Sequence, residues 1–411
     1  MLYIPKIDSI DLVYSIGMIR VVGFGFTFYK IAKLVNQGSD IQMHVYVHQR
    51  DIEMFKTDIM ELEDWLHPVG DMVKDPRNLI RGRFWKKLGR TADLYLLSED
   101  ALLFAFPQRG AKVVFLPIGF DLTVQPFPLM AMKSPGKISV KFKRTLIALL
   151  QASRIRVVNE IWASPFPVLK ARLARIGRDL RLTKFLPFPI DFAAHDSSDQ
   201  KSFQFDFPAT TKGRFLVFFP GRLMITKSSS DLLTGQTKGA AEAVKGFLKF
   251  QMDSDCDALL ILIDHSISPD RLEILHFLRE SNSEEFVLWV KSPTSDVRLS
   301  NREMAQLYEA SDVVLGDFGS GWFGQTALES AAHGKPFISH IDPEFMIECF
   351  GSNPFTIART VDDISVRLFE LFSSAPLRMQ QGTHMRNWYQ DFLSEEVVRH
   401  WFQTEIRRIA V

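Results

Sequence analysis

The sequence predicts an α/β protein with two doubly wound domains, and three features lead to this prediction. Short apolar runs alternate with segments that carry helix start and stop signals, which is typical of a parallel sheet covered by helices. The alternation occurs on both sides of a polar stretch at residues 192–212. The length of 411 residues also exceeds the usual size of one hydrophobic core. We therefore expect a first domain at 1–195, a linker at 196–212, a second domain at 213–385 and a C-terminal helix at 386–411.

The strands of both domains are predicted from these apolar runs. In the first domain they lie at 12–16, 43–47, 94–98, 113–117, 156–158 and 184–188. In the second domain they lie at 215–219, 258–263, 286–290, 312–316 and 337–339. Runs that are apolar at nearly every position are typical of parallel strands buried on both faces.

The helices between these strands are predicted from their ends. A helix at about 167–176 precedes the last strand of the first domain. In the second domain, Ser268 followed by Pro269 marks one helix start, and Ser300 with Glu303 forms a capping box at another. A helix at 326–333 ends before Gly334. Two more helices are expected after about residue 376.

Composition limits the class of protein. Hydrophobic residues make up 46% of the chain and charged residues 24%, which excludes a mainly disordered or collagen-like protein. Two cysteines exclude a disulfide framework and a cysteine metal cluster. The early apolar stretch at 14–29 is interrupted by Arg20 and is too short to cross a bilayer. Because charged residues interrupt the N-terminal segment, we expect no secretory signal and a cytoplasmic location.

The charges are divided unevenly between the two halves. Residues 1–195 hold 28 Lys and Arg against 18 Asp and Glu, a net charge of +10, and residues 196–411 hold 21 against 30, a net charge of −9. Residues 133–184 alone hold thirteen basic and two acidic side chains. A basic half indicates an anionic surface as partner. No nucleic-acid motif is present, so an anionic membrane surface is expected, and a solvated face of scattered basic residues is the alternative.

The strongest local signal for chemistry is the glycine-rich segment 316–336, GDFGSGWFGQTALESAAHGKP. It links the end of a predicted strand to the start of a helix, where free backbone N–H groups and the helix dipole attract phosphate. Gly319, Gly321 and Gly324 allow close approach of a ligand, and Glu329 is placed to accept hydrogen bonds from a ribose. The alternative is a tight structural turn followed by a solvated glutamate.

Two basic residues belong to the same predicted site. Arg222 follows Gly221 at the end of the 215–219 strand, and Lys238 begins the next helix. Open α/β sheets bind ligands at such strand ends, and two cations there neutralise a diphosphate. Each residue alone is a weak signal, because a basic residue at such a position is usually solvated.

These segments together resemble the nucleotide-sugar-binding half of a GT-B glycosyltransferase of the retaining GT4 type. The similar features, over residues 213–345, are the Gly-Arg strand end, the Lys-Gly helix start, the LYxxSDVVL segment and the FGxxxLExxAxGKP run. Residues 151–191 resemble the family more faintly. The resemblance implies two Rossmann-like domains that face a cleft, with the C-terminal helices returning to the first domain. It implies transfer of a sugar from a UDP- or GDP-linked donor to an acceptor hydroxyl on a glycan or lipid-linked molecule.

The resemblance also implies roles for individual residues. Arg222 and Lys238 stabilise the leaving diphosphate. Gly23 and Gly25 resemble the family's first glycine loop, which seats the donor phosphates or the acceptor, and a structural turn is the alternative. The donor-binding set it implies is Gly221, Asp317, Gly319, Ser320, Gly321, Phe323, Gly324 and Glu329. The family needs no divalent metal for this step, and no metal or further cofactor is expected.

Three departures from the family pattern stand out. Gly321 occupies the position of the first of two glutamates, so Asp317 or Ser320 is the substitute for a group on a sugar hydroxyl. An insertion separates Arg222 from Lys238, and Lys227 is the alternative at the shorter spacing. The loop at 115–121 lacks the family's histidine, and Asp121, its only ionisable group, is expected as a catalytic residue together with Arg222 and Lys238. Two other functions therefore stay open: a UDP-sugar 2-epimerase, and a non-catalytic protein that retains the fold.

Overall fold

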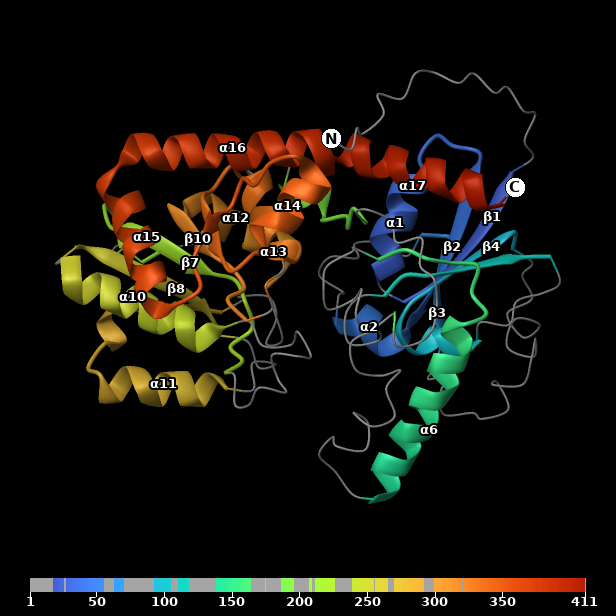
Figure 1. Ribbon diagram of the computed structural model, residues 1–411, viewed down its shortest axis with the longest axis horizontal. Coiled ribbons are helices and arrows are strands. Elements are labelled where there is room, and N and C mark those ends of the chain that lie inside the picture. Colours follow the sequence, from blue (N-terminus) through green and yellow to red (C-terminus); the bar gives the residue numbers. More distant parts are fainter. Residues whose placement is uncertain are drawn as a thin grey trace.

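The computed structural model covers the 411-residue chain. The residues it describes are 18–25, 27–54, 63–69, 92–104, 110–117, 138–163, 174, 186–195, 207–208, 211–225, 239–254, 256–264, 270–291, 299–319, 321 and 323–410. The described residues form two six-stranded parallel sheets with helices around them (Figure 1). The predicted fold class, two doubly wound domains, is confirmed.

The first sheet has the strand order β3-β2-β1-β4-β5-β6. Its strands are β1 (Ile19–Phe24), β2 (Ile41–His48), β3 (Leu66–Val69), β4 (Leu94–Leu97), β5 (Lys112–Phe115) and β6 (Glu160–Ile161). The elements that connect them include α1 (Thr27–Val35), α2 (Gln49–Met54), the 3-10 helix η3 (Glu99–Phe104) and α6 (Ile138–Ile155), and α8 (Phe192–His195) follows the sheet. The order along the sheet reverses between β1 and β4.

The second sheet has the order β12-β11-β10-β7-β8-β9. Its strands are β7 (Phe215–Phe219), β8 (Ala258–Ile263), β9 (Val287–Val290), β10 (Val313–Leu315), β11 (Phe337–Ser339) and β12 (Thr356–Ile357). The helices are α10 (Ala240–Ser254), α11 (Arg271–Glu280), the short η6 (Glu284–Phe286), α12 (Asn301–Ala310), α13 (Gln325–Ala332), α14 (Pro343–Phe350) and α15 (Val361–Ser373). Here the order reverses between β7 and β10.

Two C-terminal helices connect the second domain back to the first. Helix α16 (Ala375–Leu393) lies along the second domain, and α17 (Glu395–Ala410) lies on the first (Figure 1). Arg407 Nη2 lies 2.6 Å from Asp40 Oδ1, and Arg408 Nη2 lies 2.6 Å from Glu160 Oε2. The predicted return of the C-terminal helices is confirmed. Helix α16 runs unbroken through residues 385 and 386, where the sequence predicted a domain boundary.

Several predicted elements differ from the structure. Residues 156–158 form a turn, with Val157 N donating to Arg154 O, and the strand follows at β6. Residues 186–190 belong to no helix or strand, because Pro187 and Pro189 lack the N–H that a ladder requires. The strand predicted at 12–16 and most of the helix predicted at 167–176 lie outside the described residues. Strands β1, β3 and β12 were not predicted.

The two helix starts predicted in the second domain can be compared with the observed helices. The capping box of Ser300 and Glu303 is present at α12. Helix α11, by contrast, begins at Arg271 after Asp270, and Ser268 and Pro269 lie outside the described residues.

Among the described residues, no helix is both long enough and apolar enough to span a bilayer.

Candidate nucleotide-sugar site

The candidate site lies at the carboxyl edge of the second sheet, where the strand order reverses between β7 and β10. At such a point the connections that follow two adjacent strands go to opposite sides of the sheet and leave a crevice between them. Ligands of open α/β sheets bind in this crevice. Arg222 follows β7 directly, and its side chain is exposed. The glycine-rich loop follows β10. The topology therefore brings together two segments, 219–222 and 316–324, that are about a hundred residues apart in sequence.

Asp317 shapes the glycine-rich loop. Its Oδ1 accepts a hydrogen bond from Gly319 N at 2.8 Å, and its backbone oxygen accepts from Ser339 Oγ at 2.8 Å and from His340 N at 3.0 Å. The residue is 6% exposed. These bonds hold the loop against the end of β11. The predicted role of Asp317 on a sugar hydroxyl stays a prediction, and Ser320 lies outside the described residues.

Gly239 brings the start of α10 against the same loop. Its φ is +65°, and a Cβ built on it lies 2.6 Å from Phe318 Cβ and 3.1 Å from Phe318 Cα. Only glycine fits this contact without a shift of the neighbouring backbone. Lys238, the predicted phosphate ligand, precedes Gly239 and lies outside the described residues, as does Lys227. The sequence motif Lys-Gly thus has a structural reason for its glycine.

The N-terminus of α13 is open. Gly324 is the N-cap residue and gives no side-chain cap, and a Cβ built on it meets no atom within 4 Å. The first N–H groups of a helix are left without intrahelical partners and carry the positive end of the helix dipole. Phe323, by contrast, is 4% exposed and packs its ring 5.6 Å from those of Phe355 and Trp388. Packing thus accounts for the Phe323 ring, and the predicted donor-binding role of this residue stays a prediction.

Two further basic groups follow the neighbouring strands of this edge. Gly321 has a φ of +70°, and a Cβ built on it lies 3.8 Å from His340 Cε1. His340 follows β11, and the exposed Arg359 follows β12 by two residues. Burial, and next the charge of Arg359, lower the pKa of His340, so its ring is neutral at neutral pH. The sequence prediction missed both residues, although each follows a short apolar run.

Glu329 belongs to a buried polar cluster between the domains. It is 8% exposed, and its Oε2 accepts a hydrogen bond from Tyr308 Oη at 2.8 Å. Its Oε1 lies 3.9 Å from His195 Nε2, and His195 Nδ1 lies 3.1 Å from His333 Nε2. The rings of Tyr308 and His333 stack with their centroids 5.8 Å apart. The helix face around Glu329 is thus covered. The alternative considered from the sequence, a solvated Glu329 side chain, does not hold.

Burial sets the protonation of this cluster. It lowers the pKa of His195 to about 4 and, together with the neighbouring His195, the pKa of His333 to about 3. Burial and the Glu329 carboxylate raise the pKa of Tyr308 well above its ordinary value. At neutral pH both histidines are therefore neutral and the tyrosine stays a hydrogen-bond donor. The Tyr308 hydrogen bond orients the Glu329 carboxylate.

The first sheet has its own reversal point, between β1 and β4. Gly25 follows β1 with a φ of +118°, and a Cβ built on it lies 2.8 Å from Ser98 Oγ. Ser98 donates to Phe24 O at 3.1 Å, which ties the ends of the two strands together. Gly23 lies inside β1, where a Cβ would meet Met43 and Phe28. Packing therefore explains why residue 23 is a glycine, and the predicted role of Gly23 and Gly25 in seating the donor phosphates or the acceptor stays a prediction. Asp121 lies outside the described residues.

The described residues contain no group of His, Cys, Asp and Glu side chains arranged to hold a metal ion. The sequence does contain an Asp-x-Asp-x-Asp run at 253–257, but it lies before β8, at the opposite edge of the sheet from the candidate site. Asp253 pairs with Lys249 and Asp257 with Arg214. Asp253 and Asp257 of this run are therefore engaged in surface ion pairs.

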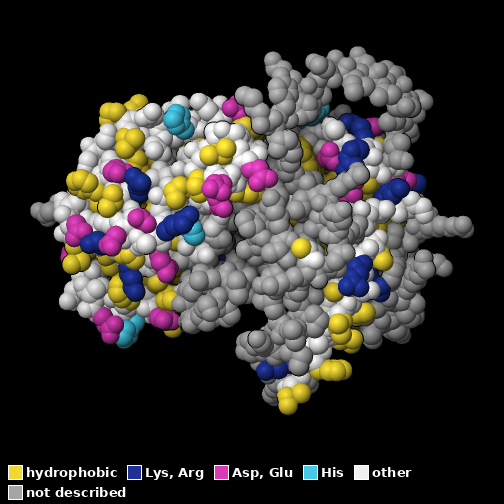
Figure 2. Space-filling view, in the orientation of Figure 1, with side chains coloured by type: hydrophobic (Ala, Val, Ile, Leu, Met, Phe, Trp, Pro, Cys, Tyr) yellow, Lys and Arg dark blue, Asp and Glu magenta, His cyan; other side chains and the backbone are white. Residues whose placement is uncertain are grey.

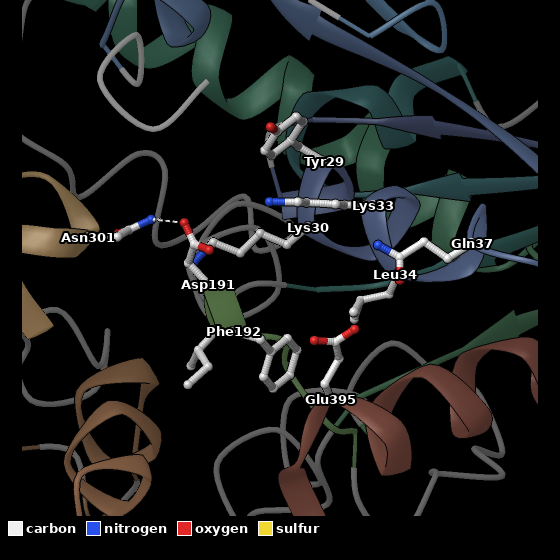
Figure 3. A pocket seen from close by; sticks show the side chains of 10 residues that line it. Tyr29, Lys30, Lys33, Leu34, Gln37, Asp191, Phe192, Asn301 and Glu395 are labelled. Atoms are coloured by element: carbon white, nitrogen blue, oxygen red, sulfur yellow. Dashed lines mark hydrogen bonds between the residues drawn. The ribbon is translucent and has the colours of Figure 1, made fainter. Parts of the chain in front are cut away.

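A separate pocket lies where the chain passes between the domains (Figure 3). It has a volume of about 110 Å³ and is lined by Tyr29 and Lys30 of α1, by Asp191 and by the first residues of α12 and α17. Asn301 Nδ2 donates to Asp191 Oδ2 at 2.9 Å across it. This pocket belongs to the junction of the two domains. None of the predicted donor-binding residues lines it.

Solved structures share this architecture over nearly the whole chain. Sucrose-phosphate synthase from Thermosynechococcus elongatus is 11% identical with a TM-score of 0.64, covering 95% of this chain and 99% of that one. HepE from Anabaena, solved with UDP and glucose, is 11% identical with a TM-score of 0.62, covering 94% and 99%. UDP-GlcNAc 2-epimerase from Methanocaldococcus jannaschii is 12% identical with a TM-score of 0.52, covering 94% and 99%.

The fold is GT-B. No protein-family model matches the chain, and no curated protein matches it in sequence. The similarity is therefore one of architecture, and the roles of individual residues depend on the site geometry described above.

Proposed function

We propose that this GT-B protein is a glycosyltransferase that moves a sugar from a nucleotide diphosphate sugar to an acceptor hydroxyl. One observation carries the proposal: the N-terminus of α13, which has no side-chain cap, and the exposed Arg222 follow adjacent strands at the reversal point of the second sheet. This arrangement presents backbone N–H groups and a cation where a diphosphate binds. The similarity to HepE, solved with UDP and glucose, supports a nucleotide sugar as the donor.

The chemistry follows from the leaving group. Breaking the anomeric C–O bond leaves negative charge on the nucleotide diphosphate, and groups that stabilise that charge lower the barrier. We assign this role to Arg222, to Lys238 and to the N–H groups at the start of α13. Glu329, oriented by Tyr308, accepts hydrogen bonds from the ribose. Asp317 or Ser320 takes the place of the glutamate that the GT4 pattern has at Gly321. His340, whose ring lies beside Gly321, and Arg359, which follows the neighbouring strand β12, are further groups that we assign to the sugar or its phosphate.

The finer proposals extend the same resemblance. They are a GT4-like hexosyl transfer with retention, no requirement for a metal ion, and a UDP- or GDP-linked donor. The acceptor is a glycan or lipid-linked molecule of cell-surface polysaccharide or glycolipid assembly. The proposed location is the cytoplasm, with the protein peripheral on the inner face of the membrane.

The test is incubation of the purified protein with UDP- and GDP-sugars, with and without acceptors, followed by separation of the products. Transfer or slow hydrolysis of a donor above background supports a glycosyltransferase. Conversion of a UDP-sugar to its C2 epimer without acceptor would identify a 2-epimerase, which the similarity to the archaeal epimerase keeps as the second candidate. Nucleotide binding without either reaction would identify a non-catalytic protein.

The choice between Lys238 and Lys227 has its own test. Lys238→Ala should cut turnover on the order of 100-fold, the usual scale for one charge-stabilising group, while Lys227→Ala leaves it unchanged. The reverse pattern would show that the phosphate ligand lies before the insertion.

A further inference from the structure

Helix α6 of the first domain carries a row of exposed apolar side chains. Ile138, Phe142, Leu146 and Leu149 are 86%, 73%, 50% and 54% exposed. Spacings of three and four residues place them on one face of the helix. Figure 2 shows hydrophobic side chains gathered at the lower tip of the molecule, where Figure 1 places α6. Single exposed apolar residues are normal, whereas a contiguous row marks an interaction surface.

Only the second half of α6 is anchored to its own domain. Its buried described residues are Ala148, Gln151 and Ile155, and Arg154 Nε donates to Leu103 O at 3.3 Å. Within α6, none of the residues before Ala148 whose side chains the structure describes is buried. The helix has 18 residues and is about 27 Å long, while the strands it connects, β5 and β6, have four and two residues. The first half therefore projects beyond the sheet.

The projection lies at the carboxyl edge of the first sheet. Helix α6 connects two adjacent parallel strands, β5 and β6, and such a crossover helix runs antiparallel to them. Its N-terminal end, which carries Ile138 and Phe142, is therefore at the edge where α/β sheets bind their ligands.

The basic side chains of α6 indicate which kind of partner covers its row of exposed apolar side chains. Helix α6 contains Lys141, Lys143, Arg144 and Arg154 and no Asp or Glu, and residues 133–184 hold thirteen basic against two acidic side chains. A second copy of this chain would place one basic helix beside another. An amphipathic helix with basic side chains beside an apolar face is typical of segments that lie in the interface of an anionic bilayer.

We propose that α6 is the membrane-contacting element of this protein, with the row Ile138–Leu149 entering the interface of an anionic phospholipid bilayer. Arg144 is exposed and Lys141 half-buried, and both belong to the polar sides of the helix near the lipid headgroups. The contact is apolar as well as electrostatic, so part of it persists when salt screens the charges. That the contact presents a lipid-linked acceptor rests on the proposed function; the contact itself does not.

The test is sedimentation of the full chain with vesicles at low and high salt. The vesicles are mixtures of phosphatidylglycerol, which is anionic, and phosphatidylcholine. The variant Phe142→Ser with Leu146→Ser should lower the partition coefficient by about 10-fold or more, since two large side chains no longer leave water. A matched control is Leu272→Ser with Met252→Ser, which removes side chains 73% and 81% exposed on the second domain. The control should bind as the wild type does. Both variants should keep the wild-type melting temperature, because the side chains they remove are exposed.

Other results would overturn the proposal. Equal vesicle binding by the α6 variant and the wild type would show that the helix is not the contact. A lipid-free dimer, detected by light scattering and lost in the α6 variant, would show that the row is an interface between two chains. UDP titrations of the same samples separate the two proposals, because vesicle binding through α6 without nucleotide binding would refute the function and support the membrane contact.

Discussion

Replacing Tyr308 by phenylalanine removes one hydroxyl from the buried cluster around Glu329 and keeps the ring. The tyrosine is fully buried, and its hydroxyl donates to Glu329 Oε2 at 2.8 Å. A hydrogen bond to a charged group contributes about 1.5–3 kcal/mol. Because Glu329 is only 8% exposed, water replaces the lost donor poorly. We expect the free energy of unfolding to fall by about 1.5–3 kcal/mol.

The same change should also weaken nucleotide binding. If Tyr308 orients the carboxylate for the ribose, its loss should lower the affinity for UDP about 10-fold, which corresponds to roughly 1.4 kcal/mol. Glu329→Gln, which keeps the shape and removes the charge, should weaken binding by about 1–3 kcal/mol. Urea unfolding measures stability, with an unchanged slope showing that both states keep their compactness. Isothermal titration with UDP measures affinity.

The double variant completes the test. Two residues that act through one hydrogen bond show a coupling energy, so the double variant should lose less than the sum of the two single losses. Additive losses, or a Tyr308→Phe protein with wild-type stability and affinity, would refute the reasoning that Tyr308 positions Glu329.

Three further predictions follow from the same site. Because burial lowers the pKa of His195 to about 4 from 6.5, the unfolded chain binds a proton between these values that the folded chain does not. Stability should therefore fall as the pH drops below 6.5, by up to about 1.4 kcal/mol per pH unit from His195 and by a similar amount from His333, whose pKa burial lowers to about 3. In urea unfolding, His195→Asn should remove the His195 part of this slope. Arg222→Ala should cut turnover on the order of 100-fold, with little change in melting temperature because the side chain is exposed; a parallel loss of stability would contradict this. Gly239→Ala should destabilise more than Gly351→Ala in thermal unfolding, because both have positive φ but only a Cβ at 239 collides with Phe318.

The sequence by itself determined the fold class and the location of the main candidate site. Buried parallel strands are read from continuous apolar runs, and β7, β8 and β9 lie within a residue or so of the predicted ranges. The capping box at Ser300 and the helix stop at Gly334 involve neighbours in the chain, so their residue types suffice to predict them. The glycine-rich segment was predicted for the same reason, since a strand, a loop and a helix start are consecutive.

Tertiary structure alone decided which side chains meet. The Glu329 cluster joins α8, α12, α13 and the turn after it, and no spacing along the chain relates His195 to Tyr308 or His333. Likewise, only the tertiary structure places the Phe323 ring in the core, against Phe355. Short strands were not predicted, because two residues such as those of β12 are too few to show an apolar pattern. Such a strand forms because it pairs with a neighbouring strand. Burial and the apposition of distant segments depend on packing of the whole chain, and packing is not encoded in any local spacing.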